Sequence, residues 1–439
     1  MSALRRSVRV IFCSVAVVVS AICSSAYAST SISELQVELD RAEAGELVKL
    51  PPGTYEGTLH IRKPIQVEGD ETRIISRRDA VNEEPLLLVE TNGAAVRGLQ
   101  LEGNQAGLVV HGDNNRIQDV SISTGKTAIK LEKSNRNLVQ RVRINGRTAD
   151  LEQRGNGIEV RNSQDNLIEE STLDNLQDGV YLDNSARTFV RTNHISNSRY
   201  AVHMMFSNSS EVAGNILEHN VTGAMVMEDS GSQIAGNSIT KQAEHVQSQG
   251  ILLYHVQGAK VVRNTVDGNR IGLYVDSSTG NYVEGNQIMH NFLGLQMKDS
   301  TGNEFLANTW AGNVIQAQAA DSHENLMKGN YWEDHQGLDL NGDGHSEISY
   351  QASPFFLSLT EAVPAYQLFF QTPGLAILQD LFTSGTDNWL RDESPLMSPA
   401  SRGVREKTSS RGLLIGISLL LLGAGIMPFG RRIRRRVQR

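Results

Sequence analysis

Apolar and polar residues alternate in short runs along the middle of the chain, and the runs recur at a fixed interval. Each run opens on a small residue, and successive openings lie 22 residues apart except at one five-residue insertion: Gly157, Gly179, Ala201, Gly223, Gly250, Gly272 and Gly294. Period-two alternation indicates β-strands, and the Asn, Ser and Asp residues between the runs suit tight corners. A short fixed period indicates stacked units, because one unit cannot bury its apolar face alone.

The repeat predicts an all-β fold, a right-handed parallel β-helix solenoid with coils of about 22 residues. Leucine-rich repeats have similar periods, but their asparagine and leucine spacing is missing, and propellers need about twice the repeat. Ser33 and Gln36 fit the Ser-x-x-Gln form of a capping box, which predicts a short N-terminal helix that closes the open end of the solenoid. Polar insertions at 147–154 and 241–249 are expected to form surface loops.

The N-terminus has the pattern of a secretory signal. Basic residues precede an apolar stretch, and Ala26-Tyr27-Ala28 follows, so residues 1–28 are predicted to be a signal peptide. An uncleaved membrane anchor is the alternative. Both cysteines, Cys13 and Cys23, lie in this segment, so the exported chain has no thiol and its soft-metal chemistry must use Met and His.

The C-terminus has the pattern of a membrane anchor. Residues 412–430 are apolar and predict one transmembrane helix, and the six arginines of 431–439 predict a basic cytoplasmic tail. A buried helix or a removed sorting signal are the alternatives. The β-helix is assigned to 29–350, and the proline-containing, partly helical 351–411 is predicted to be a C-terminal extension that docks a membrane partner or folds back on the solenoid. The net charge of −8 gives no reason to expect nucleic acid.

Two adjacent coils place unusual residues outward. The first and third residues after each opening are apolar and expected inside, whereas the second and fourth face outward. His203 and Met205 occupy the outward positions of one coil, and Met225 and Met227 those of the next, so the four are expected to stack about 4.8 Å apart. We call them the Met/His patch. Thioether sulfur and imidazole suit Cu(I), so the patch is predicted to be a copper site.

Other interpretations of the patch stay open. Methionine adapts to many surfaces, so the patch also fits an apolar surface covered by the C-terminal segment or by a partner. His219, His245 and His255 lie nearby in the sequence and are further candidate ligands.

A second candidate metal site follows the last repeat. Asp339, Asn341 and Asp343 place oxygen ligands at alternate positions, as in the first half of an EF-hand calcium loop, although Tyr350 stands where that loop has a glutamate. The alternative is a turn rich in Asx and Gly. A calcium site would be completed by His345 and Glu347.

No catalytic constellation is evident in the sequence. The sequence shows no paired carboxylates at the same height of the stack with a basic partner, and no Ser/His/Asp set whose spacing supports a catalytic triad, so we expect a protein that is not an enzyme. The alternative function is a periplasmic polysaccharide-modifying enzyme, a lyase or an epimerase, which would need acidic groove residues with a basic partner.

Several motifs carry a resemblance to a known family. They are Leu-Pro-Pro-Gly-Thr-Tyr at 50–55 with Lys-Pro-Ile at 63–65, Arg-Tyr-Ala-Val-His-Met-Met-Phe at 199–206, Gly-Asn-Tyr-Trp-Glu-Asp at 329–334, and the apolar segment after Pro364. Together they resemble NosD-type proteins, the periplasmic accessory factors for maturation of nitrous oxide reductase. The likeness spans nearly the whole exported chain, and the C-terminal span with its arginine tail departs from the expected pattern.

The resemblance implies a periplasmic protein that works with the membrane and ATPase subunits of an ABC transporter. Its further expected partners are a copper chaperone, apo nitrous oxide reductase and the inner membrane, to which the C-terminal helix would anchor it. The implied task is assembly of the copper-sulfide centre of the reductase, with transient Cu(I) hand-over at the Met/His patch.

Overall fold

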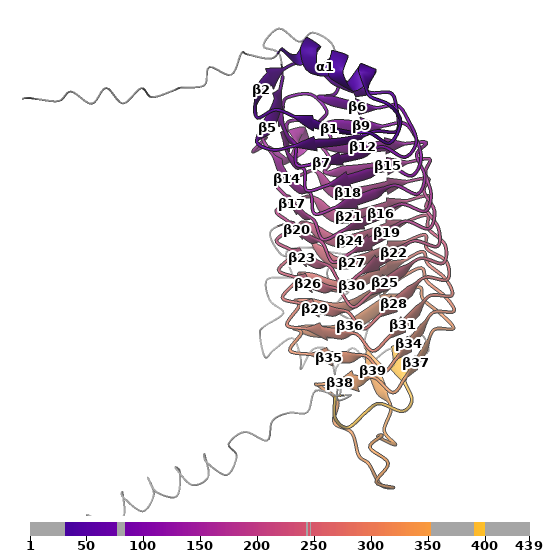
Figure 1. Cartoon of the computed structure of the whole chain (residues 1–439). Coiled ribbons are helices and arrows are strands. Elements are labelled where there is room, and N and C mark those ends of the chain that lie inside the picture. Colours follow the sequence, from indigo (N-terminus) through magenta and orange to yellow (C-terminus); the bar gives the residue numbers. More distant parts are fainter. Residues whose placement is uncertain (1–30, 77–83, 243–244, 246, 353–389, 400–439) are drawn as a thin grey trace, which may run out of the picture.

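The computed structural model describes residues 31–76, 84–242, 245, 247–352 and 390–399. They form an elongated stack of coils closed at one end by the helix α1 (Ile32–Arg41) (Figure 1). Each coil contributes one strand to each of three sheets, so the described body is a right-handed parallel β-helix of about 22 residues per coil. The fold predicted from the repeat is confirmed.

The first sheet has 15 strands. In spatial order they are β1 (Leu47–Leu50), β4 (Gln66–Gly69), β7 (Ala95–Arg97), β10 (Arg116–Gln118), β13 (Leu138–Gln140), β16 (Leu167–Glu169), β19 (Phe189–Arg191), β22 (Glu211–Ala213), β25 (Gln233–Ala235), β28 (Lys260–Val262), β31 (Tyr282–Glu284), β34 (Glu304–Leu306), β37 (Leu326–Lys328), β40 (Leu390–Asp392) and β39 (Tyr350–Ala352).

The second sheet has 13 strands. They are β2 (Gly53–Glu56), β5 (Thr72–Ile75), β8 (Gln100–Gly103), β11 (Ser121–Thr124), β14 (Arg143–Gly146), β17 (Thr172–Asp174), β20 (His194–Ser196), β23 (Ile216–Glu218), β26 (Ser238–Thr240), β29 (Thr265–Asp267), β32 (Gln287–Met289), β35 (Thr309–Ala311) and β38 (Tyr331–Trp332).

The third sheet has 12 strands. They are β3 (Leu59–Ile61), β6 (Leu87–Val89), β9 (Leu108–Val110), β12 (Ile129–Glu132), β15 (Ile158–Arg161), β18 (Asp178–Asp183), β21 (Tyr200–Met205), β24 (Thr222–Met227), β27 (Gln249–Tyr254), β30 (Ile271–Asp276), β33 (Leu293–Lys298) and β36 (Ile315–Ala320).

Inward residues of all three sheets form one continuous apolar core. In β18, Val180 and Leu182 have no exposed surface, and their neighbours in β21, Val202 and Met204, are equally buried. Strands of successive coils pair in parallel, so each inward residue packs on its equivalent in the next coil. The face assignment made from the alternation is therefore correct for these strands.

A column of buried asparagines holds the corner between the first and second sheets. Its members, one per coil, are Asn193, Asn215, Asn237, Asn264, Asn286, Asn308 and Asn330. From Asn215 onward, each side-chain oxygen accepts the backbone and side-chain N–H groups of the preceding member at 2.9–3.1 Å. These bonds satisfy corner amides that water cannot reach.

The last asparagine is bonded to a residue from far along the chain. The fully buried Asp392 of β40 accepts the backbone N–H of Asn330 at 3.0 Å and its side-chain amide at 2.8 Å. The same carboxylate oxygen accepts the indole N–H of Trp332 at 3.2 Å. Residues 390–399 therefore return to the last coil and terminate its hydrogen-bond column.

At the other end, α1 covers the first coil with Leu35 and Leu39, which are buried against it. The capping box lies two residues earlier than predicted. Ser31 is the N-cap, its hydroxyl accepts the N–H of Glu34, and the Glu34 carboxylate accepts the N–H of Ser31. The predicted Ser33–Gln36 capping box is therefore wrong. The Gln36 side chain instead forms two hydrogen bonds with the backbone of His60 in the first coil.

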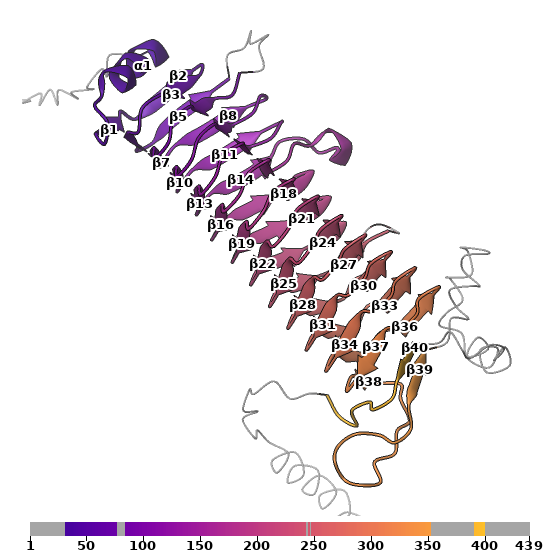
Figure 2. The same cartoon turned by 90° about the vertical axis from the view of Figure 1, so that its right-hand side faces the viewer.

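The first insertion is a loop before β15 of the third sheet, and the described residues 241, 242, 245, 247 and 248 of the second precede β27 of the same sheet. The first contains the short 3₁₀ helix η1 (Leu151–Gln153) and protrudes from the edge of the stack in Figure 2. The Arg154 guanidinium fixes this loop by donating to the carbonyls of Thr148, Ala149 and Asn197.

The predicted signal peptide, transmembrane helix and basic tail lie outside the described residues, as does most of the extension 351–411. Within the described ranges, no helix is long and apolar enough to cross a membrane.

Candidate functional site

The Met/His patch lies on the outer face of the third sheet, in β21 and β24. His203 pairs in register with Met225, and Met205 pairs with Met227, as the repeat predicts. The three methionines are half-buried, and the Tyr181 hydroxyl donates to the Met205 sulfur at 3.7 Å. Adjacent coils therefore place three thioethers and one imidazole in a two-by-two arrangement.

His203 is more enclosed than an ordinary outward residue, with 8% of its surface exposed. Its Nδ1 atom lies 2.8 Å from the Oδ2 atom of Asp178, which is itself buried. The Arg199 guanidinium donates two hydrogen bonds of 3.0 Å to the two oxygens of the same carboxylate. Because an ionised carboxylate only accepts hydrogen bonds, Nδ1 carries a proton, and in the neutral ring Nε2 then carries the lone pair.

The Nε2 atom of His203 is buried and has no hydrogen-bond partner among the described residues. The rings of Tyr181 and Tyr200 flank the imidazole, with centroids 4.8 and 5.0 Å away. A buried polar atom without a partner is costly, and native structures keep such atoms mainly where a ligand, ion or water completes them. The unpartnered Nε2 atom and the neighbouring thioethers are a donor set that fits a soft metal ion when the ring is neutral.

Sequence reasoning missed the charged residues around His203. The structure has two buried carboxylates that each pair with an arginine: Asp178 with Arg199, and Glu159 with Arg161 at 2.9 Å. Asp178 stands before the glycine of its repeat, outside the alternating positions used to assign faces. The repeat interval could have found it. The residue one repeat after Asp178 is Tyr200, which pairs with it in register and is next to Arg199 in the chain.

A groove of about 630 Å³ runs over the third sheet next to the patch. Both insertions contribute to its lining, the first with Leu151 and Glu152 and the second with His245. Met225 also lines the groove, so the structure brings this methionine and His245 to one cavity. The insertions therefore do lie on the side of the solenoid that carries the candidate site.

The other two candidate histidines lie at corners. His255 stacks on Tyr254 with centroids 4.2 Å apart, and Tyr254 is the strand neighbour of Met227, so His255 lies near the edge of the patch. His219 follows β23 of the second sheet in a left-handed backbone conformation. Among the residues that the structure describes, no three His, Cys, Asp or Glu side chains gather as a metal site.

The loop with Asp339, Asn341 and Asp343 has the geometry of consecutive Asx turns. Asp339 accepts the N–H groups of Gly342 and Gly344, Asn341 accepts that of Asp343, and Asp343 accepts that of His345. Two hydrogen bonds, first from the His345 N–H and second from the Asn341 amide, hold the pKa of Asp343 below its usual value.

The two residues expected to complete a calcium site already have hydrogen-bond partners. The His345 ring contacts Ser394 at 3.0 Å, and the Glu347 carboxylate accepts the N–H of Leu340. A turn explains all these contacts, and calcium binding stays a prediction.

If calcium binds this loop, a chelator should lower the melting temperature of the purified protein. Ligand linkage gives about 2.7 kcal/mol of stabilisation at 100 times Kd. Asp343→Ala should abolish the difference between calcium and chelator, because it removes one of the predicted oxygen ligands. Magnesium serves as the matched control ion. Equal melting temperatures of the wild type with calcium and with chelator would show that the loop is a turn only.

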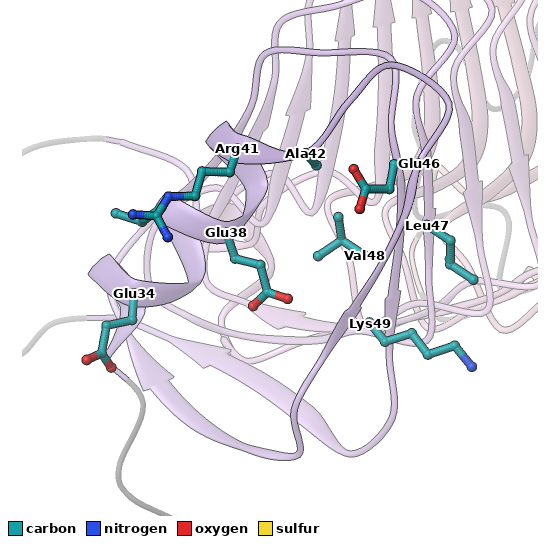
Figure 3. A pocket seen from close by; sticks show the side chains of 9 residues that line it. Glu34, Glu38, Arg41, Ala42, Glu46, Leu47, Val48 and Lys49 are labelled. Carbon is teal, nitrogen blue, oxygen red and sulfur yellow. The ribbon is translucent and has the colours of Figure 1, made fainter.

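A second hollow, of about 740 Å³, lies at the N-terminal end between α1 and β1. Figure 3 shows the charged side chains that line it, among them Glu38, Arg41 and Lys49. Glu38 and Arg41 come from the helix, and Lys49 from the strand. None of the predicted ligands contributes to this hollow, which makes it a less suitable metal site than the patch.

The described body has the fold of polysaccharide-active β-helices. The alginate lyase AlyF-OU02 in complex with G6 matches with a TM-score of 0.56 and 11% identity over 71% of this chain and 87% of that chain. The Yersinia enterocolitica family 28 exopolygalacturonase matches with a TM-score of 0.52 and 10% identity, over 67% and 75%. At such low identity the likeness concerns the fold alone. No curated protein matches the sequence.

A family model gives the more specific comparison. The model described as "Periplasmic copper-binding protein (NosD)" matches residues 140–337. This range contains the Met/His patch, Asp178 and Arg199, and every groove residue named above. The resemblance predicted from the sequence is confirmed over residues 140–337, which match the NosD family model and lie within the right-handed parallel β-helix.

Proposed function

We propose that this chain is a periplasmic accessory protein that handles Cu(I) during assembly of the copper-sulfide centre of nitrous oxide reductase. The observation that carries the proposal is the two-by-two arrangement of His203, Met205, Met225 and Met227, with a buried imidazole nitrogen that lacks a partner among the described residues. The family description supports copper and the periplasm. The protein is then not an enzyme, and copper is its cargo.

The donor set favours transfer over storage. Thioether sulfur is a soft, neutral ligand that binds Cu(I) without releasing a proton, and half-buried methionines remain reachable by an incoming partner. In this proposal a copper chaperone loads the patch, apo nitrous oxide reductase unloads it, and the membrane and ATPase subunits of an ABC transporter hold the assembly. The groove beside Met225 gives these proteins a recessed surface to bind.

The test replaces the three methionines of the patch by leucine. Leucine keeps the apolar surface and costs little in packing, so the triple variant removes sulfur and little else. In anaerobic titration against a chromophoric chelator, the wild type should bind about one equivalent of Cu(I) on the ligand count of a single site. The triple variant should bind at least about tenfold more weakly, a loss of roughly 1.4 kcal/mol.

The matched control is Met297→Leu, an inward core methionine with no exposed surface. It should keep the wild-type Cu(I) affinity, because its sulfur does not reach the outer face. A triple variant that binds Cu(I) like the wild type excludes the patch as the site. A triple variant that still supports a fully copper-loaded reductase in cells means that the patch is a docking surface.

Tethering to the inner membrane is part of the proposal. It rests on the apolar segment 412–430 and the arginines that follow it. A reporter active only outside the cytoplasm should work when fused after residue 400, and one active only inside should work after Arg439. The opposite pattern would remove the single-span topology and the tether.

The cluster around His203 also favours a second candidate function. An imidazole held by a buried carboxylate, with Tyr181, Tyr200 and Arg199 beside it, resembles the acid–base groups that a polyuronate lyase or epimerase needs. Incubation with alginate and polygalacturonate, followed by the ultraviolet absorbance of unsaturated uronate and by NMR of the sugar epimers, tests this function. A product that disappears in His203→Gln would establish the enzyme and overturn the accessory role.

A further inference from the structure

Three side chains from two neighbouring coils form a chain of contacts that ends at the Met/His patch. Arg199 donates to both oxygens of Asp178 at 3.0 Å, and Asp178 accepts from Nδ1 of His203 at 2.8 Å. The Asp178 and His203 side chains are nearly enclosed, with 2% and 10% of their surface exposed. The Arg199 guanidinium also lies over the Tyr200 ring, 4.4 Å from its centroid.

This arrangement leaves Asp178 one orientation. A bidentate guanidinium contact fixes the plane of a carboxylate as well as its position. The remaining lone pair of Oδ2 faces the imidazole, so His203 is held by a group that cannot itself rotate away. The flanking rings of Tyr181 and Tyr200 restrict the imidazole on its other sides.

A purely structural ion pair with Asp178 does not explain why the Nε2 atom of His203 has no hydrogen-bond partner in the described structure. A histidine buried for stability would be expected to bond both ring nitrogens, whereas Nε2 has no partner in the described structure. In metal sites, by contrast, a ligating histidine commonly donates its second N–H to a carboxylate, and that carboxylate fixes its tautomer and orientation.

We infer that Asp178 and Arg199 are positioning residues, which hold His203 as the Nδ1–H tautomer so that the Nε2 lone pair is the nitrogen donor to a soft metal ion at the patch. Only the identity of the metal rests on the proposed function; the tautomer does not.

The first experiment needs no variant of the positioning residues. The full-length chain, labelled with ¹⁵N histidine, is studied by long-range ¹H–¹⁵N correlation at neutral pH. His203→Gln identifies the His203 signals among those of the 11 histidines by subtraction. The expected result is a protonated Nδ1 and an unprotonated Nε2. An Nε2–H tautomer, or a ring protonated on both nitrogens, would overturn the inference.

The second experiment uses Asp178→Asn. The asparagine keeps the shape of the side chain, but its NH₂ group can donate to Nδ1, which moves the imidazole proton to Nε2. The expected results are an inverted tautomer and a Cu(I) affinity lower by about tenfold to hundredfold. The matched control is Asp183→Asn, which removes a carboxylate from the residue that pairs with Met205 and should change neither result.

The outcomes separate the inference from the proposed function. If Asp178→Asn inverts the tautomer but leaves Cu(I) affinity unchanged, Nε2 is not the donor atom and the inference fails while the thioether site stands. If the wild type binds no Cu(I), the proposed function fails, and the histidine spectrum still decides whether Asp178 positions His203. If Asp178→Asn does not fold, the wild-type spectrum alone decides which tautomer His203 adopts.

Discussion

Replacement of Asp392 by leucine is expected to open the last coils of the β-helix while the first coils stay closed. Asp392 ends the asparagine column by accepting three buried N–H groups, two from Asn330 and one from Trp332. Leucine has no acceptor, so all three donors would be left without a partner inside the stack. Each such donor costs about 1–3 kcal/mol.

The damage should be local, because a solenoid coil contacts only its neighbours and its stability depends on them. Trp332 stacks between Trp310 and Tyr350, with centroids 5.3 and 4.2 Å away, so this aromatic stack should loosen together with the column. Hydrogen exchange followed by mass spectrometry measures the effect coil by coil. Peptides from 309–332 should exchange faster in Asp392→Leu, whereas peptides from 158–240 should not change.

Asp392→Asn is the informative comparison, because an asparagine carbonyl performs the same task in every earlier coil of the column. It should lose much less protection than the leucine variant. Asp321→Asn, at an exposed corner near the same end, controls for the loss of one charge. Unchanged exchange in Asp392→Leu would mean that the returning segment 390–399 adds nothing to the stability of the last coil.

The repeat made the body of the fold predictable, and the reason is physical. Period-two alternation gives the face of each residue, and a constant interval gives the residue above it, so inward Val202 and outward His203 could both be placed without coordinates. The return of β40 could not be foreseen, because Asp392 lies outside the repeat and its partner, Asn330, is 62 residues away.

The candidate site was predictable to the same extent. The stacking of Met205 under Met227 follows from the interval alone, and the structure has it. Asp178 was missed because it stands just outside the alternating run, where the alternation no longer shows which way a side chain faces. The capping box was misplaced because the sequence offers two boxes two residues apart, Ser31 with Glu34 and Ser33 with Gln36, and the structure uses the first.

A second large effect is expected two residues after Met227, at Asp229. This residue has 2% of its surface exposed and occupies the position that serine holds in the preceding coil, Ser207. Its Oδ2 atom accepts the Ser232 hydroxyl at 2.9 Å, while Oδ1 is buried and has no bonding partner among the described residues. Burial disfavours the charged form and raises the pKa of Asp229 from 3.8 to about 6.

The sign of the resulting pH dependence follows from linkage. Because the folded-state pKa lies above that of the unfolded chain, the stabilising contribution of Asp229 is complete below about pH 4 and is lost as pH rises through 6. A shift of about two units corresponds to roughly 3 kcal/mol. At neutral pH the charged Asp229 therefore destabilises the coil that carries Met225 and Met227 by up to this amount.

Asp229→Asn should thus stabilise the protein at pH 7.5 and make little difference at pH 4, since asparagine keeps the shape and the acceptor without the charge. Denaturant unfolding of both proteins at several pH values measures the difference between their free energies of unfolding. The titration of all other groups cancels in this difference, because both proteins share those groups. Asp321→Asn, which is exposed, should show no such pH dependence. A gain for Asp229→Asn that is equal at both pH values would show that Asp229 is not the titrating group, and a loss at pH 7.5 would show that its charge is bound by a partner.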